Sequence, residues 1–126
     1  MPQYDSQQFE PPAPVAEVTL RNRQTGKTCE GVLMLLDTGA DVSLIPEWSV
    51  QQLELTTIPD KKYELVSFDG QVRIAPVVDL EMVFLDKTLR GRYIPVNQSW
   101  GIIGRNILNL FSLRFDGPGE VWEINT

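Results

Sequence analysis

The 126-residue sequence contains no histidine and only one cysteine, Cys29. Without histidine, the chain cannot form Ser-His or Cys-His nucleophilic pairs, and it lacks the commonest zinc ligand. Cys29 alone cannot close an internal disulfide, and no second thiol or imidazole is present to complete a metal site. We therefore expect Cys29 to be a small residue within a strand, and we expect neither a metal nor a cofactor. A hydrolase built from this chain must transfer protons with carboxylates.

The sequence also lacks long apolar runs and an excess of positive charge. No stretch is long enough to span a bilayer, and residues 1–6 have neither the basic start nor the apolar core of a signal peptide. Seventeen acidic residues against eleven basic ones give a net charge of −6, which disfavours a nucleic-acid partner. A hydrophobic content of 42% suits one folded domain with one core. We expect a cytoplasmic protein without a membrane span.

Composition divides the chain into two regions. Residues 1–14 hold four prolines and three glutamines, which predicts an extended N-terminal arm. Residues 15–126 alternate short apolar runs with turn signals, a pattern typical of a small β-barrel or sandwich. A short helical turn is a further candidate within residues 48–53, and a short helix is expected after Gly104.

Three hairpins are expected in the second region. Asp69-Gly70 stands between two alternating runs and gives a strong hairpin signal. A second hairpin is expected from residues 77–85 and 91–96, around Asp86-Lys87-Thr88. The Gly-Pro-Gly turn at residues 117–119 predicts a third, self-contained hairpin near the C-terminus.

The most informative segment is Leu35-Leu36-Asp37-Thr38-Gly39-Ala40-Asp41. Residues 31–36 read as a strand buried on both faces, and they deliver the Asp37 carboxylate to a rigid, partly dry place. Gly39 permits a tight turn with an approachable N–H. The Thr38 hydroxyl can both donate and accept hydrogen bonds.

This segment resembles the active-site loop of the aspartic peptidases. Residues 101–108, Gly-Ile-Ile-Gly-Arg-Asn-Ile-Leu, resemble the apolar-Gly-Arg-Asn segment of retropepsins, the small peptidases typified by retroviral proteases. The two motifs occur in the family's order, with a hairpin signal between them. The resemblance covers residues 15–125 and implies an all-β, retropepsin-like closed barrel (the acid-protease fold) with one short C-terminal helix. The flap, which is the hairpin that closes over the substrate in this family, and the C-terminal tail differ here from the viral pattern. Both differences suit a cellular or bacterial member of the family.

Hydrolysis of a peptide bond by carboxylates requires two of them, which share one proton when they are held close together. The chain contains a single Asp-Thr-Gly, so we expect a homodimer in which each subunit contributes Asp37. The predicted function is that of an aspartic endopeptidase acting on peptides or proteins. The resemblance also implies inhibition by pepstatin-type or retroviral-protease-type compounds.

The resemblance assigns roles to further residues. The catalytic set is Asp37, Thr38 and Gly39. The substrate-binding set is Ala40, Asp41, Phe68, Asp69, Gly70, Ile102 and Ile103. The supporting set is Gly104, Arg105 and Asn106. Within these sets, residues 68–70 are expected at the tip of a flap that closes over the substrate, and Asp41 is expected to pair with Arg105.

Three departures from the family pattern bear on function. The flap tip holds a single glycine, whereas viral flaps are rich in glycine. In retroviral proteases, the termini of the two subunits interleave at the dimer contact. The self-contained C-terminal hairpin of this chain is compatible with a different dimer contact. Ala40 replaces a serine that is common in pepsin-like enzymes and whose hydroxyl can donate to the carboxylate. Because the loss of a donor to the charged form raises a carboxyl pKa, we expect a pH optimum that is less acidic than pepsin's but on the acid side of neutral.

Two functions other than that of a peptidase are also considered from the sequence. The chain could be a catalytically silent module that binds peptides or proteins on the same fold, because fold alone does not establish chemistry. It could also be a phosphatase-like enzyme with an aspartyl nucleophile at a strand end. That second reading requires an α/β scaffold and another Asp two positions after Asp37, where this chain has Gly39.

Overall fold

The computed structural model describes residues 2–59, 61–66 and 69–125. Within them the chain is mostly strand, as expected, with two short helices, α1 (Glu47–Gln52) and α2 (Arg105–Leu108). The strands are β1 (Tyr4–Asp5), β2 (Ala13–Arg21), β3 (Thr28–Leu36), β4 (Leu44–Pro46), β5 (Lys62–Val66), β6 (Val72–Pro76), β7 (Val78–Phe84), β8 (Lys87–Val96), β9 (Gly101–Ile103), β10 (Leu113–Asp116) and β11 (Val121–Ile124). Neither helix has the length and apolar character needed to cross a membrane.

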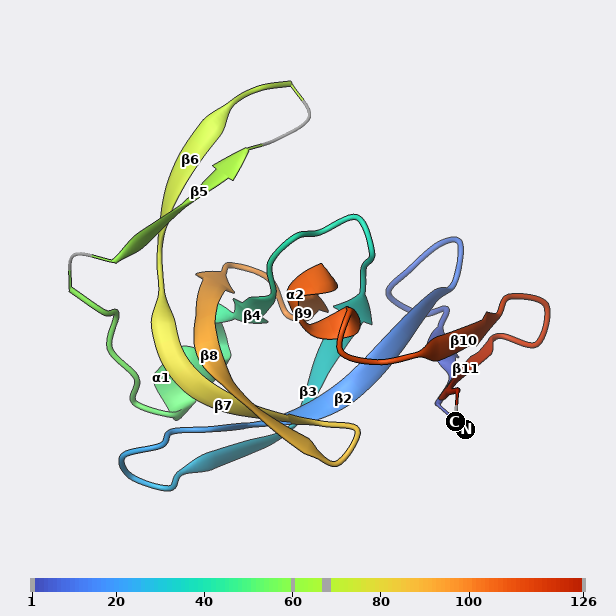
Figure 1. Ribbon diagram of the computed structural model, residues 1–126, viewed down its shortest axis with the longest axis horizontal. Coiled ribbons are helices and arrows are strands. Elements are labelled where there is room, and N and C mark those ends of the chain that lie inside the picture. Colours follow the sequence, from blue (N-terminus) through green and yellow to red (C-terminus); the bar gives the residue numbers. More distant parts are fainter. Residues whose placement is uncertain (1, 60, 67–68, 126) are drawn as a thin grey trace.

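Six strands form a closed barrel, which confirms the predicted architecture (Figure 1). They follow one another in the order β2-β3-β9-β4-β8-β7, and β7 pairs back onto β2. Closure satisfies the edges of these strands within the ring. The core is filled by apolar side chains that point inward from alternate positions, among them Leu20, Val32, Met34, Ile45, Leu80, Met82 and Ile103.

The strand that leads to Asp37 is buried on one face only. Val32 and Met34 are fully buried in the barrel core, whereas Leu33 and Leu35 are half-buried on the outer surface. The expectation that residues 31–36 are buried on both faces is therefore wrong. A strand in a barrel wall has an inside and an outside, and in the single chain the outside of β3 is only partly covered.

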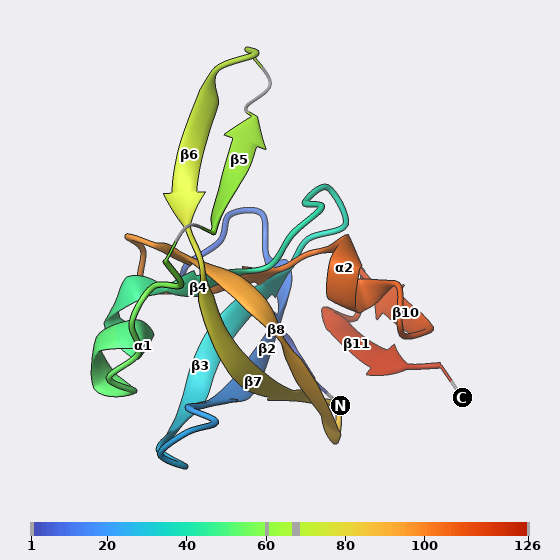
Figure 2. The same cartoon turned by 60° about the vertical axis from the view of Figure 1, so that its left-hand side comes forward.

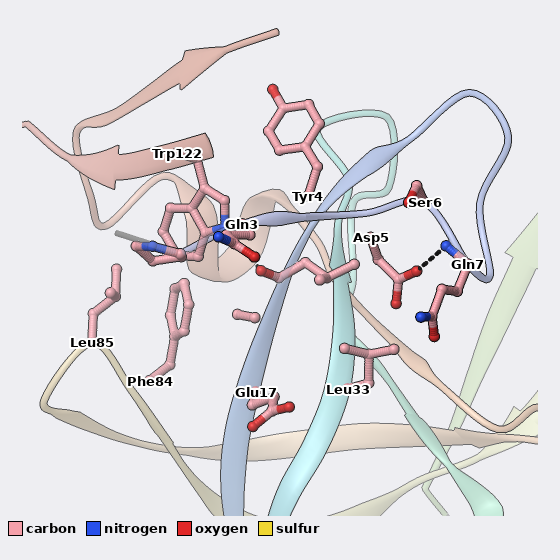
Figure 3. A pocket seen from close by; sticks show the side chains of 13 residues that line it. Gln3, Tyr4, Asp5, Ser6, Gln7, Glu17, Leu33, Phe84, Leu85 and Trp122 are labelled. Atoms are coloured by element: carbon pink, nitrogen blue, oxygen red, sulfur yellow. Dashed lines mark hydrogen bonds between the residues drawn. The ribbon is translucent and has the colours of Figure 1, made fainter. Parts of the chain in front are cut away.

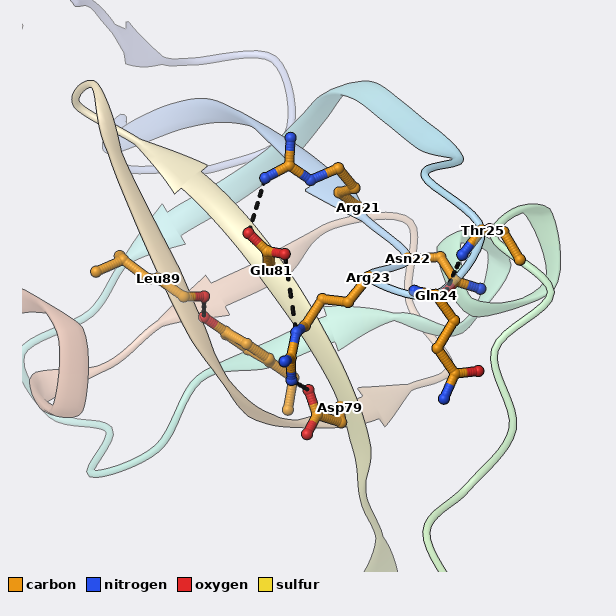
Figure 4. A network of polar contacts seen from close by, with 9 residues as sticks. Arg21, Asn22, Arg23, Gln24, Thr25, Asp79, Glu81 and Leu89 are labelled. Carbon is orange, nitrogen blue, oxygen red and sulfur yellow. Dashed lines mark hydrogen bonds and ion pairs between the residues drawn. The ribbon is translucent and has the colours of Figure 1, made fainter.

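Ion pairs reinforce the seam where β7 meets β2 (Figure 4). Arg21 Nη2 lies 2.7 Å from Glu81 Oε2, and Arg23 lies 3.2 Å from Asp79 and 3.8 Å from Glu81. The buried Asn22 amide donates to the Leu53 carbonyl at 2.9 Å, which ties the β2–β3 turn to the end of α1. These polar contacts hold the barrel closed at the point where its first and last wall strands meet.

Two hairpins project from the barrel in different directions (Figures 1 and 2). β5 and β6 form the hairpin predicted from Asp69-Gly70, and β10 and β11 form the predicted C-terminal hairpin. The hairpin of β7 and β8 was also expected, but its turn is Leu85-Asp86. Both of those residues have positive φ, as a two-residue hairpin turn requires, so β8 already begins at Lys87.

Residues 2–14 lie along the barrel. β1 pairs with the start of β2, and the Phe9 ring contacts the Trp100 ring edge-on at 4.8 Å between centroids. A hollow of ≈ 690 Å³ separates this segment from the barrel wall (Figure 3). Its floor includes Leu33, Phe84 and Trp122. The division of the chain into an arm and a domain at residue 14 stays a prediction.

Candidate active site

The barrel places the two motifs side by side. β3 runs parallel to β9, with Leu35 beside Ile102 and Leu36 beside Ile103. The Asp37 N–H then donates to the Ile103 carbonyl at 3.0 Å. Asp37 is therefore anchored by the second motif as soon as it leaves its strand, and the carboxylate sits at the end of a rigid element.

The loop after β3 orients the Asp37 carboxylate. Its Oδ1 accepts a hydrogen bond from the Gly39 N–H at 2.9 Å, and the Ala40 N–H donates to the Asp37 carbonyl at 3.2 Å. The bond to the Gly39 N–H gives the carboxyl group a fixed direction relative to the loop. Asp37 is half-buried, whereas Thr38 and Gly39 are exposed at the tip of the loop.

A buried hydroxyl joins this loop to the second motif. Ser43 Oγ accepts from the Gly104 N–H at 3.0 Å and donates to Asn106 Oδ1 at 2.8 Å. The Ser43 residue is 1% exposed and its bond with Gly104 is buried, whereas its bond to the exposed Asn106 is part-buried. Ser43 was not among the predicted site residues. In the sequence, Ser43 stands out only as a hydroxyl between two apolar residues. Its role depends on Gly104, 61 positions away, so no local pattern could identify it.

Two glycines of the second motif are required by close approach of the backbone. A Cβ on Gly104 would lie 2.3 Å from the Val42 carbonyl oxygen, and one on Gly101 would lie 2.4 Å from the Leu44 carbonyl oxygen. Only a residue without a side chain fits at either place. The predicted supporting position Gly104 thus lies directly against the loop that follows Asp37.

Arg105 binds a different partner from the one expected. Its Nη1 donates to the Thr38 carbonyl oxygen at 2.7 Å, and its backbone N–H donates to the Ala40 carbonyl at 2.8 Å. Within residues 2–59, 61–66 and 69–125, no ion pair joins Arg105 to Asp41, and Asp41 is exposed. The predicted Asp41–Arg105 pair is absent because the arginine, at the start of α2, reaches the loop backbone instead.

The two isoleucines of the second motif differ in exposure. Ile103 is fully buried in the barrel core, beneath the Asp37 loop, and no substrate could reach it in this structure. Ile102 is half-buried on the outer face. Its neighbours across β3 and β4 are Leu35 and Leu44, which are also half-buried. These three residues, here called the apolar row, lie beside Asp37, and two of them were not predicted.

The β5–β6 hairpin rises from the same neighbourhood. Leu65 packs against the buried cluster of Ala75, Val77 and Ile94, against which Val42 and Leu44 also pack. Gly70 has φ +85°, and the Gln71 N–H donates to Asp69 Oδ1 at 3.1 Å. Phe68, the third residue of the expected flap tip, lies outside the described residues.

The Asp37 loop does not line either of two hollows found on the chain. One is the ≈ 690 Å³ hollow beneath residues 2–7, and the other is a polar hollow of ≈ 550 Å³ next to the barrel seam, lined by Arg23, Asp79 and Glu81 among others. Asp37 itself is half-buried, and the neighbouring Thr38 and Gly39 face solvent.

Comparisons with known proteins bear on the fold. No protein-family model matches the chain, and no curated protein matches its sequence. Among solved structures, the EIAV protease complexed with the inhibitor HBY-793 matches with a TM-score of 0.54 and 20% sequence identity. The match covers 77% of this chain and 86% of that protease. The chain has a retropepsin-like fold.

This retropepsin-like fold excludes one of the earlier readings. A phosphatase-like enzyme needs alternating strands and helices, whereas this chain is a closed barrel with two short helices. At 20% identity, the likeness establishes the fold and not the roles of individual side chains. Those roles belong to the proposal that follows.

Proposed function

We propose that this chain is one subunit of a homodimeric aspartic endopeptidase. One observation carries the proposal. Asp37 stands at the end of a barrel strand with one carboxylate oxygen held by the Gly39 N–H, next to an exposed Thr38, in a retropepsin-like fold. A single such carboxylate per chain supplies half of a proton-sharing pair. The open surface beside Asp37 is where a second copy would complete the cleft.

In the proposed reaction, the two Asp37 carboxyl groups share one proton. The ionised carboxylate takes a proton from water, and the resulting hydroxide attacks the carbonyl carbon of the scissile peptide bond. The protonated carboxyl donates its proton to the carbonyl oxygen. When the tetrahedral intermediate collapses, the C–N bond breaks and the leaving nitrogen takes up the proton that the first carboxyl took from water. The second carboxylate takes a proton back from one of the two hydroxyls on the carbon, which forms the new carboxyl group and restores the shared proton. Thr38 would hydrogen-bond the partner's loop, and Gly39 would offer its backbone to the substrate.

The surroundings of Asp37 support a substrate with apolar side chains next to the cut bond. The apolar row of Leu35, Ile102 and Leu44 offers half-buried aliphatic surface on the strands around Asp37. Ala40 is half-buried and Asp41 is exposed beyond it, where a substrate N–H could be accepted. The β5–β6 hairpin would act as the flap that excludes water.

The test is digestion of a peptide library by the wild type and by Asp37→Asn, from roughly pH 4 to 7.5. Asp86→Asn is the matched control, because Asp86 lies in the β7–β8 turn with φ +63°, a conformation that Asn tolerates. We expect cleavage on the acid side of neutral by the wild type and the control only. Equal cleavage by Asp37→Asn would mean that Asp37 is not the catalytic residue.

The same experiment separates the enzyme from a catalytically silent binding module. If a wild type shown to be dimeric by sedimentation cleaves no peptide at any pH, the endopeptidase proposal fails. Retention of library peptides by that uncleaving dimer would then favour the binding module. If the proposal is correct, a pepstatin-type inhibitor should block the cleavage of the peptides.

A further inference from the structure

The two ends of the chain form a small sheet of their own. β11 pairs with β10 along one edge. On its other edge, the Tyr4 N–H donates to the Glu120 carbonyl at 2.9 Å and the Trp122 N–H donates to the Pro2 carbonyl at 3.0 Å, while Gln3 bridges Val121. Residues 2–4 and β11 accordingly lie side by side, although they come from opposite ends of the sequence. Both edges of β11 are thus used within one chain.

β10 is the outermost strand of this terminal sheet. In the part of the chain that the structure describes, β11 is its only strand partner, so its other edge presents unpaired N–H and C=O groups. The Asn125 N–H donates to the Ser112 carbonyl at 2.7 Å, and alternation along an antiparallel ladder then directs the polar groups of Leu113 and Phe115 to the outer edge. No proline or glycine interrupts Leu113–Asp116 to block pairing there.

The same hairpin carries exposed apolar side chains. The register puts Phe115 opposite Trp122 and Leu113 opposite Ile124, so all four share one face. Trp122 is 1% exposed and packs near Phe84, but that face continues beyond the barrel. Phe115 and Ile124 are 42% and 43% exposed, and Leu110 after α2 is 58% exposed. We call Phe115 and Ile124, which lie on one face of the hairpin, the terminal patch. Exposed apolar clusters of this kind mark contact surfaces.

We propose that the outer edge of β10 and the terminal patch bind a second copy of the chain, while each chain keeps its own N-terminal strand. The proposal rests on the homodimer of the proposed function. Under a twofold axis, an edge strand pairs antiparallel with its own copy. An axis through Phe115 sets the two Phe115 rings against each other. It also sets Arg114, which pairs with Glu123 at 3.2 Å within its own chain, opposite Asp116 of the partner subunit, whose Oδ1 accepts from the Gly119 N–H, so charges of opposite sign meet twice.

The position of β10 fits the requirement that two Asp37 loops meet. α2 lies between the β3–β4 loop and β10, and Arg105 at its start bonds the Thr38 carbonyl (Figure 2). α2 thus connects the exposed loop at Thr38 to the C-terminal hairpin. A dimer formed there holds a sheet of four strands in the order β11-β10-β10-β11, with residues 2–4 of each chain along its outer edges and no exchange of termini.

A disulfide trap distinguishes this dimer from one with exchanged N-terminal strands. Gln3 and Val121 are replaced by cysteine in a Cys29→Ser background, oxidised under native conditions and run on a non-reducing gel. We expect a single-chain band from a protein that sediments as a dimer. A covalent dimer that dissociates on reduction would mean exchange of the termini, which overturns this inference and leaves the proposed function intact.

A charge at the axis tests the surface itself. Phe115→Glu should raise the dimer dissociation constant at least about tenfold, measured by sedimentation equilibrium, with an unchanged circular dichroism spectrum. Ile74→Glu is the matched control, because Ile74 is also an exposed apolar strand residue, at 61%, but lies on the β5–β6 hairpin. Equal dissociation constants for the two variants would overturn the inference. A wild type that stays monomeric at every concentration would overturn both this contact and the homodimer.

Discussion

Arg105 Nη1 donates a hydrogen bond to the carbonyl oxygen of Thr38 at 2.7 Å, although the two residues are 67 positions apart. The bond crosses from the first turn of α2 to the exposed tip of the Asp37 loop. A guanidinium donor to a neutral acceptor adds fixed direction as well as energy. The contact therefore holds the backbone of a loop whose side chains are otherwise open to solvent.

Replacing Arg105 by alanine should loosen this loop more than it destabilises the barrel. The bond is exposed, so we expect Arg105→Ala to lower the free energy of unfolding by only about 0.5–1.5 kcal/mol. The activity proposed for Asp37 should fall further than that loss explains. Urea unfolding at fixed protein concentration and peptidase assays measure the two effects. Arg92→Ala, at another exposed arginine, is the control. Identical behaviour of the two variants would show that the Thr38 contact contributes nothing.

The buried hydroxyl of Ser43 should matter more for stability. Ser43→Ala removes the acceptor of the buried Gly104 N–H and the donor to the exposed Asn106. Leaving the buried Gly104 N–H unpaired costs about 1–3 kcal/mol, which corresponds to a fall of several degrees in the melting temperature. Calorimetry checks this. Ser6→Ala, at an exposed serine, should melt with the wild type. A Ser43→Ala variant that also does so would show that water replaces the hydroxyl.

Alanine at Gly104 should be poorly tolerated. Its Cβ would approach the Val42 carbonyl carbon and the Ala40 carbonyl oxygen to 2.8 and 2.9 Å, in addition to the shorter contact with the Val42 oxygen, and none of these backbone atoms can rotate away. We expect a loss of about 2 kcal/mol or more in the free energy of unfolding. Gly117→Ala is the control, because nothing lies within 4 Å of its Cβ. Equal stability of both variants in urea would mean that the loop shifts without cost.

The sequence predicted those parts of the fold that local signals determine. Asp69-Gly70 specified a hairpin turn, and the order of the Asp37 and Gly104 motifs indicated the barrel before any coordinate was known. The partner of Arg105 was mispredicted, because charge alone favoured Asp41 and the actual acceptor is a backbone carbonyl whose direction depends on the folded loop. Ser43 was missed for the same reason. Its role exists only once β9 lies beside β4.

Pairing between the chain ends could not be predicted either. Residues 1–14 have the composition of an extended arm, and nothing local shows that Tyr4 will bond Glu120, more than a hundred positions away. Loop closure over that distance is stabilised only by the finished barrel, which supplies β2 as a template for β1. Exposure of Leu35 on the outer wall, likewise, follows from barrel closure rather than from its apolar neighbours.

Tyr93 should make the stability of the protein fall in strong alkali. Burial raises the pKa of Tyr93 to about 12, and its hydroxyl donates to the Leu89 carbonyl at 3.0 Å. In the unfolded chain, a tyrosine ionises near its ordinary pKa of about 10. The unfolded state therefore loses this proton first as the pH rises, and the folded state loses stability between about pH 10 and 12, on the order of 2 kcal/mol in total.

Below about pH 10 this contribution is constant, so the free-energy difference between wild type and Tyr93→Phe should not vary with pH there. Above pH 10 the wild type should lose stability faster than Tyr93→Phe, because the variant has no phenol to ionise. Urea unfolding from pH 8 to 12 measures the difference, and a late step in phenolate absorbance should disappear in the variant. Tyr63→Phe, at a tyrosine 37% exposed, should follow the wild type. Parallel loss of stability in wild type and Tyr93→Phe would show that the folded barrel admits the Tyr93 phenolate, and that groups elsewhere cause the alkaline unfolding.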